Sequence, residues 1–128
     1  MADNTPANLT EEPHRQSGHL TVKALQALVD DWIRDYGVRY FSEMTNLAVL
    51  MEEVGELARI MARTYGEQSF KGEVATPHLA DEIADVLFVL TCIANQTGVD
   101  LESAISSNLK KKTDRDRLRH HNNPKLNS

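Results

Sequence analysis

Two acidic runs about thirty residues apart constrain this chain of 128 residues more than any other feature. The first extends from Glu52 to Glu56 and the second from Asp81 to Asp85, and both lie within long apolar patterns of helical period. Residues three apart fall on the same face of an α-helix, which turns by about 100° per residue. Each run therefore stacks two carboxylates on one helix face, and four such carboxylates can hold a hard cation.

The positions of the acids relative to the apolar faces strengthen this interpretation. Glu82 projects into the apolar face of its helix and Asp85 lies at the edge, while Glu53 borders the other apolar face and Glu56 lies a step further out. Carboxylates near a core are costly unless a positive group compensates, and no Lys or Arg lies three or four residues from Glu82. We therefore expect these four acids to bind metal. An all-oxygen ligand set favours Mg²⁺ or Mn²⁺ over zinc.

Solvated surface acids are the alternative, since most acids on helices face water. For Glu52 and Asp81, which point away from the apolar faces, the two interpretations stay equally open. A ferritin-like di-iron site would require Glu-x-x-His on two helices, and neither run has a His at that offset.

The chain as a whole has the composition of one small helical domain. It is 41% hydrophobic but only 5% aromatic, which predicts a core of Leu, Val, Ile, Ala and Met. A net charge of -5 does not suggest nucleic-acid binding. The single Cys92, the lack of a secretory signal and the lack of a membrane-length apolar stretch predict a cytoplasmic protein without a membrane partner.

Caps and apolar periodicity predict an all-α four-helix bundle. We expect a flexible N-terminal arm over 1–19, a helical domain over 20–119 and a C-terminal tail over 120–128. The expected helices run from Thr21 to about Tyr36, from Ser42 to about Thr64, from about His78 to Thr97, and from Leu101 to about Lys112. Antiparallel packing of the middle two would bring the acid pairs face to face, and the small core favours a homo-oligomer.

Three helical positions leave alternatives open. Trp32 lies in an apolar stripe, so it is expected in the core, with stacking on a base as the other possibility. Gly55 lies between the acids of the second helix, where it would permit close approach of another helix or of a ligand. Asn46 lies two turns before the acids and is either a surface residue or, as we predict, a substrate-binding group.

The C-terminal end of the domain is basic. The segment 110–121 has six Lys and Arg and two acids, so it carries +4 while the rest of the chain carries -9. Cations at a helix C-terminus suit the helix dipole, and they also suit phosphate oxygens. Both explanations stay open from the sequence alone.

Glu52-Glu53-Val54-Gly55-Glu56-Leu57 followed by Asp81-Glu82-Ile83-Ala84-Asp85-Val86 resembles the double acidic motif of MazG-like nucleotide pyrophosphohydrolases, in the all-α NTP pyrophosphatase superfamily. The resemblance covers about residues 21–119. It implies Mg²⁺-dependent hydrolysis of nucleoside triphosphates to monophosphate and pyrophosphate by dimers or tetramers with shared pockets.

Carried over by position, the resemblance makes Glu53, Glu56, Glu82 and Asp85 the metal ligands. Glu52 would bind a further metal or orient the attacking water, so Glu52 and Glu53 are the predicted catalytic acids. The predicted phosphate contacts are Lys111, Lys112, Arg115 and Arg119.

We therefore predict a pyrophosphohydrolase for canonical or damaged nucleoside triphosphates, with a house-cleaning role. Phosphoribosyl-ATP pyrophosphohydrolase is the alternative within the superfamily. A non-catalytic helical interaction module is the alternative from another class, and only the metal enzyme should gain thermal stability in Mg²⁺.

Overall fold

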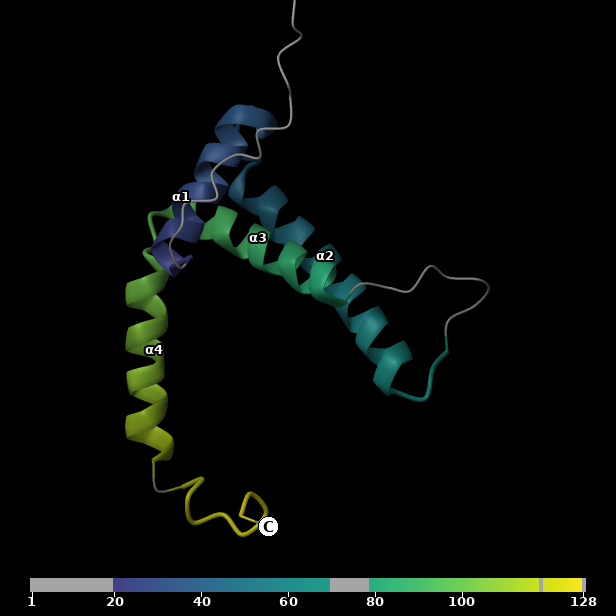
Figure 1. The fold of residues 1–128 in the computed structure, drawn as a ribbon, viewed down its shortest axis with the longest axis vertical. Coiled ribbons are helices and arrows are strands. Elements are labelled where there is room, and N and C mark those ends of the chain that lie inside the picture. The colour runs from purple at the N-terminus through teal and green to yellow at the C-terminus, as the bar shows by residue number, and fades with distance from the viewer. Residues whose placement is uncertain (1–19, 70–78, 118, 128) are drawn as a thin grey trace, which may run out of the picture.

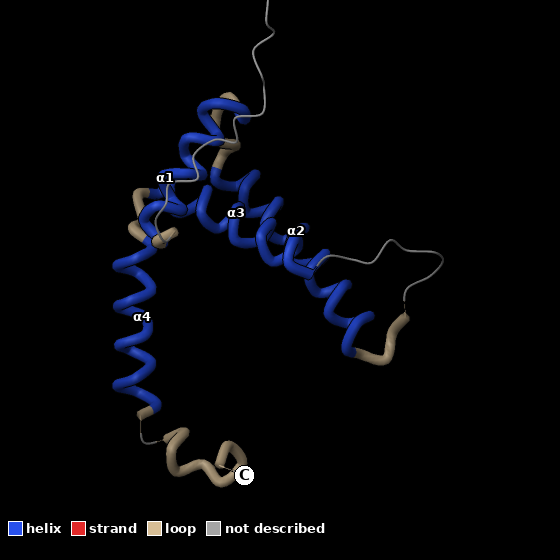
Figure 2. Tube along the Cα trace, in the orientation of Figure 1, coloured by secondary structure: helices blue, strands red, loops and turns tan. Residues whose placement is uncertain are grey.

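The computed structural model describes residues 20–69, 79–117 and 119–127. Within these ranges the chain is helical and contains no strand (Figures 1 and 2). The elements are α1 (Val22–Trp32), the π-helical turn η1 (Ile33–Gly37), α2 (Glu43–Tyr65), α3 (Leu79–Thr97) and α4 (Leu101–Asp116). The predicted all-α class is confirmed. The arm expected over 1–19 lies outside the described residues.

Side-chain caps begin three of the helices. The Thr21 hydroxyl accepts a hydrogen bond from the Ala24 amide at 3.0 Å, and the Ser42 hydroxyl accepts one from the Thr45 amide at 3.3 Å. The Asp100 carboxylate accepts one from the Glu102 amide at 3.0 Å. Each cap satisfies an amide that has no partner within its helix, which is why the sequence located these starts.

A tight turn joins the first helical segment to α2. Val38 has a φ of 70°, and the Arg39 amide donates to the Gly37 carbonyl at 2.8 Å, as in a γ-turn. This backbone conformation is strained for a β-branched residue. The turn brings Tyr40 back against α1, where it packs on the core around Val29.

The helices pack in an open arrangement. α2 and α3 lie side by side and antiparallel, and α1 packs against α3 (Figure 1). The buried core between α1 and α3 contains Val29, Ile33 and Cys92. α4 contacts α1 at its start and then extends away from α2 and α3 (Figure 2). A single chain therefore supplies the four helices without closing them into a bundle.

A polar network fixes α1 to the end of α3. The Asn95 amide nitrogen donates to the Gln26 carbonyl at 3.0 Å and to the Tyr40 hydroxyl at 3.1 Å, while its oxygen accepts from the Gln26 side chain at 3.0 Å. The Tyr40 hydroxyl donates to Asp30 at 2.7 Å. Burial and this bond to Asp30 raise the pKa of Tyr40 to about 12.

Much of the apolar surface expected in the core is exposed in the single chain. Met44 and Met51 on α2 are 73% and 69% exposed, and Ile83 on α3 is 51% exposed. Further apolar side chains that are more than a third exposed are Leu47, Val54 and Met61 on α2, Leu87 and Leu90 on α3, and Ile105 and Leu109 on α4. The described residues of one chain therefore leave much of this apolar surface uncovered.

No helix in the described ranges is by itself long and apolar enough to cross a membrane. The pair α3 and α4 meets the length and composition criteria only when taken together, and it is bent by 105°.

Candidate metal centre

Three acidic side chains from two helices meet where α2 packs on α3. Carboxylate oxygens of Glu53, Glu82 and Asp85 all lie within 4.8 Å of one another. Glu53 comes from α2, and Glu82 and Asp85 lie three residues apart on α3, so their side chains share one helix face. The antiparallel packing thus brings acids from both runs together, as the spacing predicted.

The electrostatics of this acidic cluster, Glu53, Glu82 and Asp85, are unfavourable for the protein alone. The Oε2 atom of Glu82 is buried and has no hydrogen-bond partner among the described residues. Burial is the main cause that raises the pKa of Glu53, and repulsion from Asp85 and Glu82 raises it further. The described part of the chain provides no Lys or Arg ion pair to any of the three acids. A hard divalent cation is the group that these oxygen donors fit.

The other two predicted acids lie at the margin of the cluster. Glu56 and Glu52 both raise the pKa of Glu53 by repulsion, Glu56 more than Glu52, so both charges are close to it. Their side chains are exposed, however, and neither belongs to the group of three whose oxygens lie within 4.8 Å.

Asn46 is placed apart from the acids. It is 5% exposed, and its amide nitrogen donates to the Gln96 side chain at 2.7 Å. Gln96 in turn donates to the Phe41 carbonyl at 2.6 Å. Asn46 therefore joins α2 to α3, two turns before Glu53, which is a structural task that the sequence analysis did not foresee.

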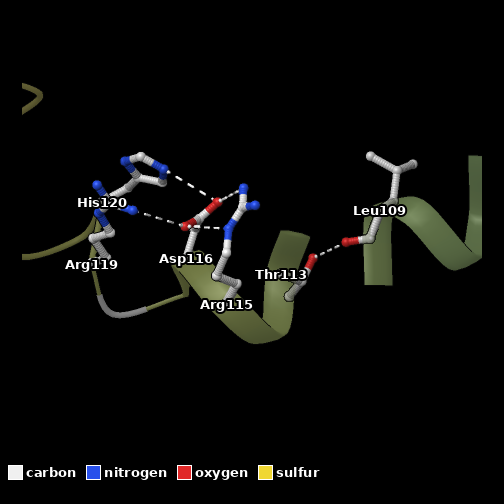
Figure 3. A network of polar contacts seen from close by, with 6 residues as sticks. All are labelled: Leu109, Thr113, Arg115, Asp116, Arg119 and His120. Atoms are coloured by element: carbon white, nitrogen blue, oxygen red, sulfur yellow. Dashed lines mark hydrogen bonds and ion pairs between the residues drawn. The ribbon is translucent and has the colours of Figure 1, made fainter. Parts of the chain in front are cut away.

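The predicted phosphate-binding residues lie on α4 and just after it. α4 extends away from α2 and α3, the helices that carry the acidic cluster (Figure 1). Asp116 binds several of the cations (Figure 3). Arg115 contacts both Asp116 oxygens, at 2.6 and 3.0 Å, and Arg119 lies 3.9 Å from the same carboxylate. The hydrogen bond from Arg115 is the main cause that lowers the pKa of Asp116.

Lys111 and Lys112 differ from the two arginines. Both are exposed, and neither forms an ion pair with another described residue. Their neighbour Lys110 pairs with Asp114 at 2.9 Å, one turn further along α4. Of the four predicted phosphate contacts, the two lysines are therefore the ones whose charge is not paired with an acid among the described residues.

Aromatic residues next to the cluster were not predicted as part of the site. Phe88 lies one turn after Asp85 on α3, and its ring meets Trp32 edge to face, with centroids 5.5 Å apart. The i, i+3 spacing from Asp85 to Phe88 was a visible signal. The sequence analysis did not consider Phe88.

The chain is similar to a known protein family and to solved structures. Residues 41–120 match the MazG nucleotide pyrophosphohydrolase domain. YpjD of Bacillus subtilis, an uncharacterized protein, is 41% identical over 99 residues, which are 77% of this chain and 89% of YpjD. The crystal structure of YpjD, described there as a candidate pyrophosphatase, has a TM-score of 0.66 and 42% identity, and the match covers 75% of this chain and 96% of that one.

A second solved structure is that of the Bacillus-conserved MazG protein, a nucleotide pyrophosphohydrolase. It has a TM-score of 0.59 and 37% identity, with coverage of 71% of this chain and 87% of that one. The family match spans α2, α3 and α4, and so includes every acid of the cluster. The chain therefore belongs to the MazG nucleotide pyrophosphohydrolase family.

Proposed function

We propose that this protein is a Mg²⁺-dependent nucleoside triphosphate pyrophosphohydrolase that releases a nucleoside monophosphate and pyrophosphate. The observation that carries the proposal is the buried Oε2 of Glu82, which has no partner among the described residues and whose carboxylate lies with those of Glu53 and Asp85. A buried carboxylate oxygen without a partner lowers the stability of the fold. A cation coordinated by this oxygen would compensate that cost and so account for the buried acid. Canonical and damaged nucleotides are both candidate substrates, and the proposed location is the cytoplasm, where these nucleotides are used.

Each residue has a proposed task. Glu53, Glu82 and Asp85 would hold Mg²⁺, with Glu56 as a fourth ligand. Mg²⁺ held there would neutralise charge on the phosphate oxygens and lower the pKa of a bound water. Glu52 would orient the attacking water, and Lys111 and Lys112 would attract the phosphates as exposed cations. Arg115 and Arg119 would bind phosphate only after their ion pairs with Asp116 break.

A homo-oligomer completes the proposal. The exposed apolar stripes of α2, α3 and α4 have no cover from the described residues of one chain, and burying such surface is the main driving force for association. The end of α4 lies away from the acidic cluster of its own chain (Figure 1). A second copy would cover the stripes and bring the basic end of its α4 to that cluster. Light scattering should give a dimer or tetramer, and a stable monomer would contradict this part.

Product analysis tests the function. Purified protein is incubated with ribo- and deoxyribonucleoside triphosphates, their oxidised or methylated forms and phosphoribosyl-ATP, in Mg²⁺ or in EDTA. We expect equal amounts of monophosphate and pyrophosphate in Mg²⁺ and none in EDTA. Turnover of phosphoribosyl-ATP alone would select the alternative enzyme. No release from any substrate, or release in EDTA, would contradict the proposal.

A further inference from the structure

An apolar hollow adjoins the acidic cluster. It lies between α1 and the first half of α3 and has a volume of about 560 Å³. Its walls include Leu25, Leu28 and Trp32 from α1, with Leu87 and Phe88 from α3. Asp85 also lines it, and is the single ionisable residue to do so among the described residues.

Two aromatic rings form part of its wall. Trp32 is 49% exposed, although its position in an apolar stripe predicted burial in the core. The Trp32 and Phe88 rings meet at 87° with centroids 5.5 Å apart, and Tyr36 supports Trp32 from the same helical run at 5.9 Å. The indole of Trp32 is thus held by neighbouring rings and still keeps about half of its surface free for a flat ligand.

Asp85 joins the hollow to the proposed metal centre. Its carboxylate belongs to the acidic cluster, and Phe88 lies one turn further along α3, a rise of roughly 5 Å. A ligand whose phosphates meet the carboxylates therefore has an apolar, aromatic-walled space next to its phosphate end. A nucleotide has this division, because a ribose separates a flat base from the charged phosphates.

We propose that this hollow binds the base of the nucleotide, with Trp32 as the stacking platform and Phe88 as the supporting wall. This inference rests on the proposed function, since the phosphates are placed at the acidic cluster. Few polar groups line the hollow, so base edges have few hydrogen-bond partners there. Selection is therefore by stacking area, with several bases accepted and purines bound more tightly than pyrimidines.

The single tryptophan of the chain makes a direct test possible, because all tryptophan fluorescence comes from Trp32. Protein in Mg²⁺ is titrated with an α,β-methylene analogue of ATP, which cannot be cleaved at that bond, and with inorganic tripolyphosphate, which has no base. We expect saturable quenching by the analogue alone, and reversal of the quenching when tripolyphosphate competes. Equal quenching by tripolyphosphate, or none by the analogue, would overturn the proposal.

Kinetics of Trp32 variants give a second readout. Trp32→Leu should raise the KM for ATP by about 10- to 100-fold with little change in kcat, because stacking is lost. Trp32→Phe should retain most of the affinity, and tripolyphosphate should inhibit all forms with the same inhibition constant. Tyr65→Leu removes an exposed aromatic residue at the end of α2 and is the control that leaves KM unchanged. Unchanged KM in Trp32→Leu would also overturn the proposal.

Two further outcomes separate this inference from its premise. Pyrophosphate release without base-dependent quenching would remove the base site and leave the proposed function intact. Base-dependent quenching without release from any substrate would remove the proposed function and keep a nucleotide-binding site. If a second copy covers Trp32, iodide will not quench the nucleotide-free protein and the analogue will change nothing, which overturns the base site.

Discussion

Buried polar side chains at the two ends of α3 differ in whether they have hydrogen-bond partners. In the last turn, the Asn95 side chain donates to Gln26 and Tyr40 and accepts from Gln26, so both its nitrogen and its oxygen are satisfied. In the first turns, Glu82 has a buried oxygen with no partner in the described chain. Buried polar groups in folded proteins are nearly always paired, and an unpaired one costs stability. The comparison separates a polar group that holds the fold from one that, in our proposal, is kept for a metal ion.

The largest expected effect concerns Glu82. Glu82→Gln keeps the size of the side chain but removes its charge, so it should lower kcat/KM by at least about 100-fold, more than a change in residues that only support a metal ligand. Metal-free thermal stability should be equal or higher, since repulsion within the acidic cluster falls. Thermal denaturation should also show no added stability from Mg²⁺.

Glu43→Gln is the matched control. Glu43 is an exposed acid in the first turn of α2, ten residues before Glu53 and so about 15 Å along the helix. Activity and the Mg²⁺ effect should stay as in the unmodified protein. Full activity in Glu82→Gln would put the metal centre elsewhere and remove the contrast between the two ends of α3.

Asn95 should show the opposite behaviour. Asn95→Ala breaks the hydrogen bonds to Gln26 and Tyr40 and should lower the free energy of unfolding by about 2 kcal/mol. The kcat of the folded fraction should not change. Asn108→Ala, at an exposed asparagine on α4, should stay within about 0.5 kcal/mol in the same urea unfolding experiment. A loss of kcat in Asn95→Ala at unchanged stability would reverse its assigned task.

Tyr40, which accepts a hydrogen bond from Asn95 near the end of α3, should make the stability of the protein depend on pH. Its folded pKa of about 12 lies above the usual 10.0, because burial and the bond to Asp30 favour the protonated phenol. The unfolded chain then loses this proton first, so the stabilisation is complete below pH 10 and is lost towards pH 12. Tyr40→Phe should cost about 1 kcal/mol at pH 8.

The difference in unfolding free energy between Tyr40→Phe and the unmodified protein should shrink steadily above pH 10. Matched unfolding curves at several alkaline pH values measure this difference directly. A difference that stays constant with pH would show that Tyr40 titrates in the folded protein as it does in the unfolded chain.

The smallest expected effect is at Gly55, between the acids of α2. A Cβ added there meets no atom within 4 Å, and glycine within a helix costs about 1 kcal/mol relative to alanine. Gly55→Ala should therefore raise the free energy of unfolding by up to about 1 kcal/mol. Gly66→Ala, where the added Cβ would clash with the Ala62 carbonyl, should lower it. Lower stability in Gly55→Ala would show that another subunit fills this space.

Local features of the fold were predictable because local rules govern them. Thr21, Ser42 and Asp100 cap helices where their side chains can reach free amides, and the predicted ends of α2 and α3 agree with the structure to within about a residue. α4 extends to Asp116 and not to about Lys112, and the Lys110–Asp114 pair spans its last turn. The π-helical turn before Val38 has no sequence rule behind it and was not foreseen.

The candidate site was predictable in part for the same reason. Spacing along each helix placed Glu82 beside Asp85, but which of Glu53 and Glu56 faces them depends on the rotation of α2 against α3. The pairing of Asn46 with Gln96 depends on residues fifty positions apart. Trp32 was expected in the core because the sequence does not reveal how much of an apolar stripe one chain can cover.

Direct metal binding is the most decisive measurement. A Mn²⁺ titration followed by electron paramagnetic resonance counts the bound ions and gives their affinity without any need for turnover. The unmodified protein should bind at least one Mn²⁺ per chain, and Glu82→Gln should bind it at least about tenfold more weakly, while Glu43→Gln should match the unmodified protein. Equal Mn²⁺ binding by Glu82→Gln, or no binding by the unmodified protein, would contradict the assignment of Glu53, Glu82 and Asp85 as the metal centre.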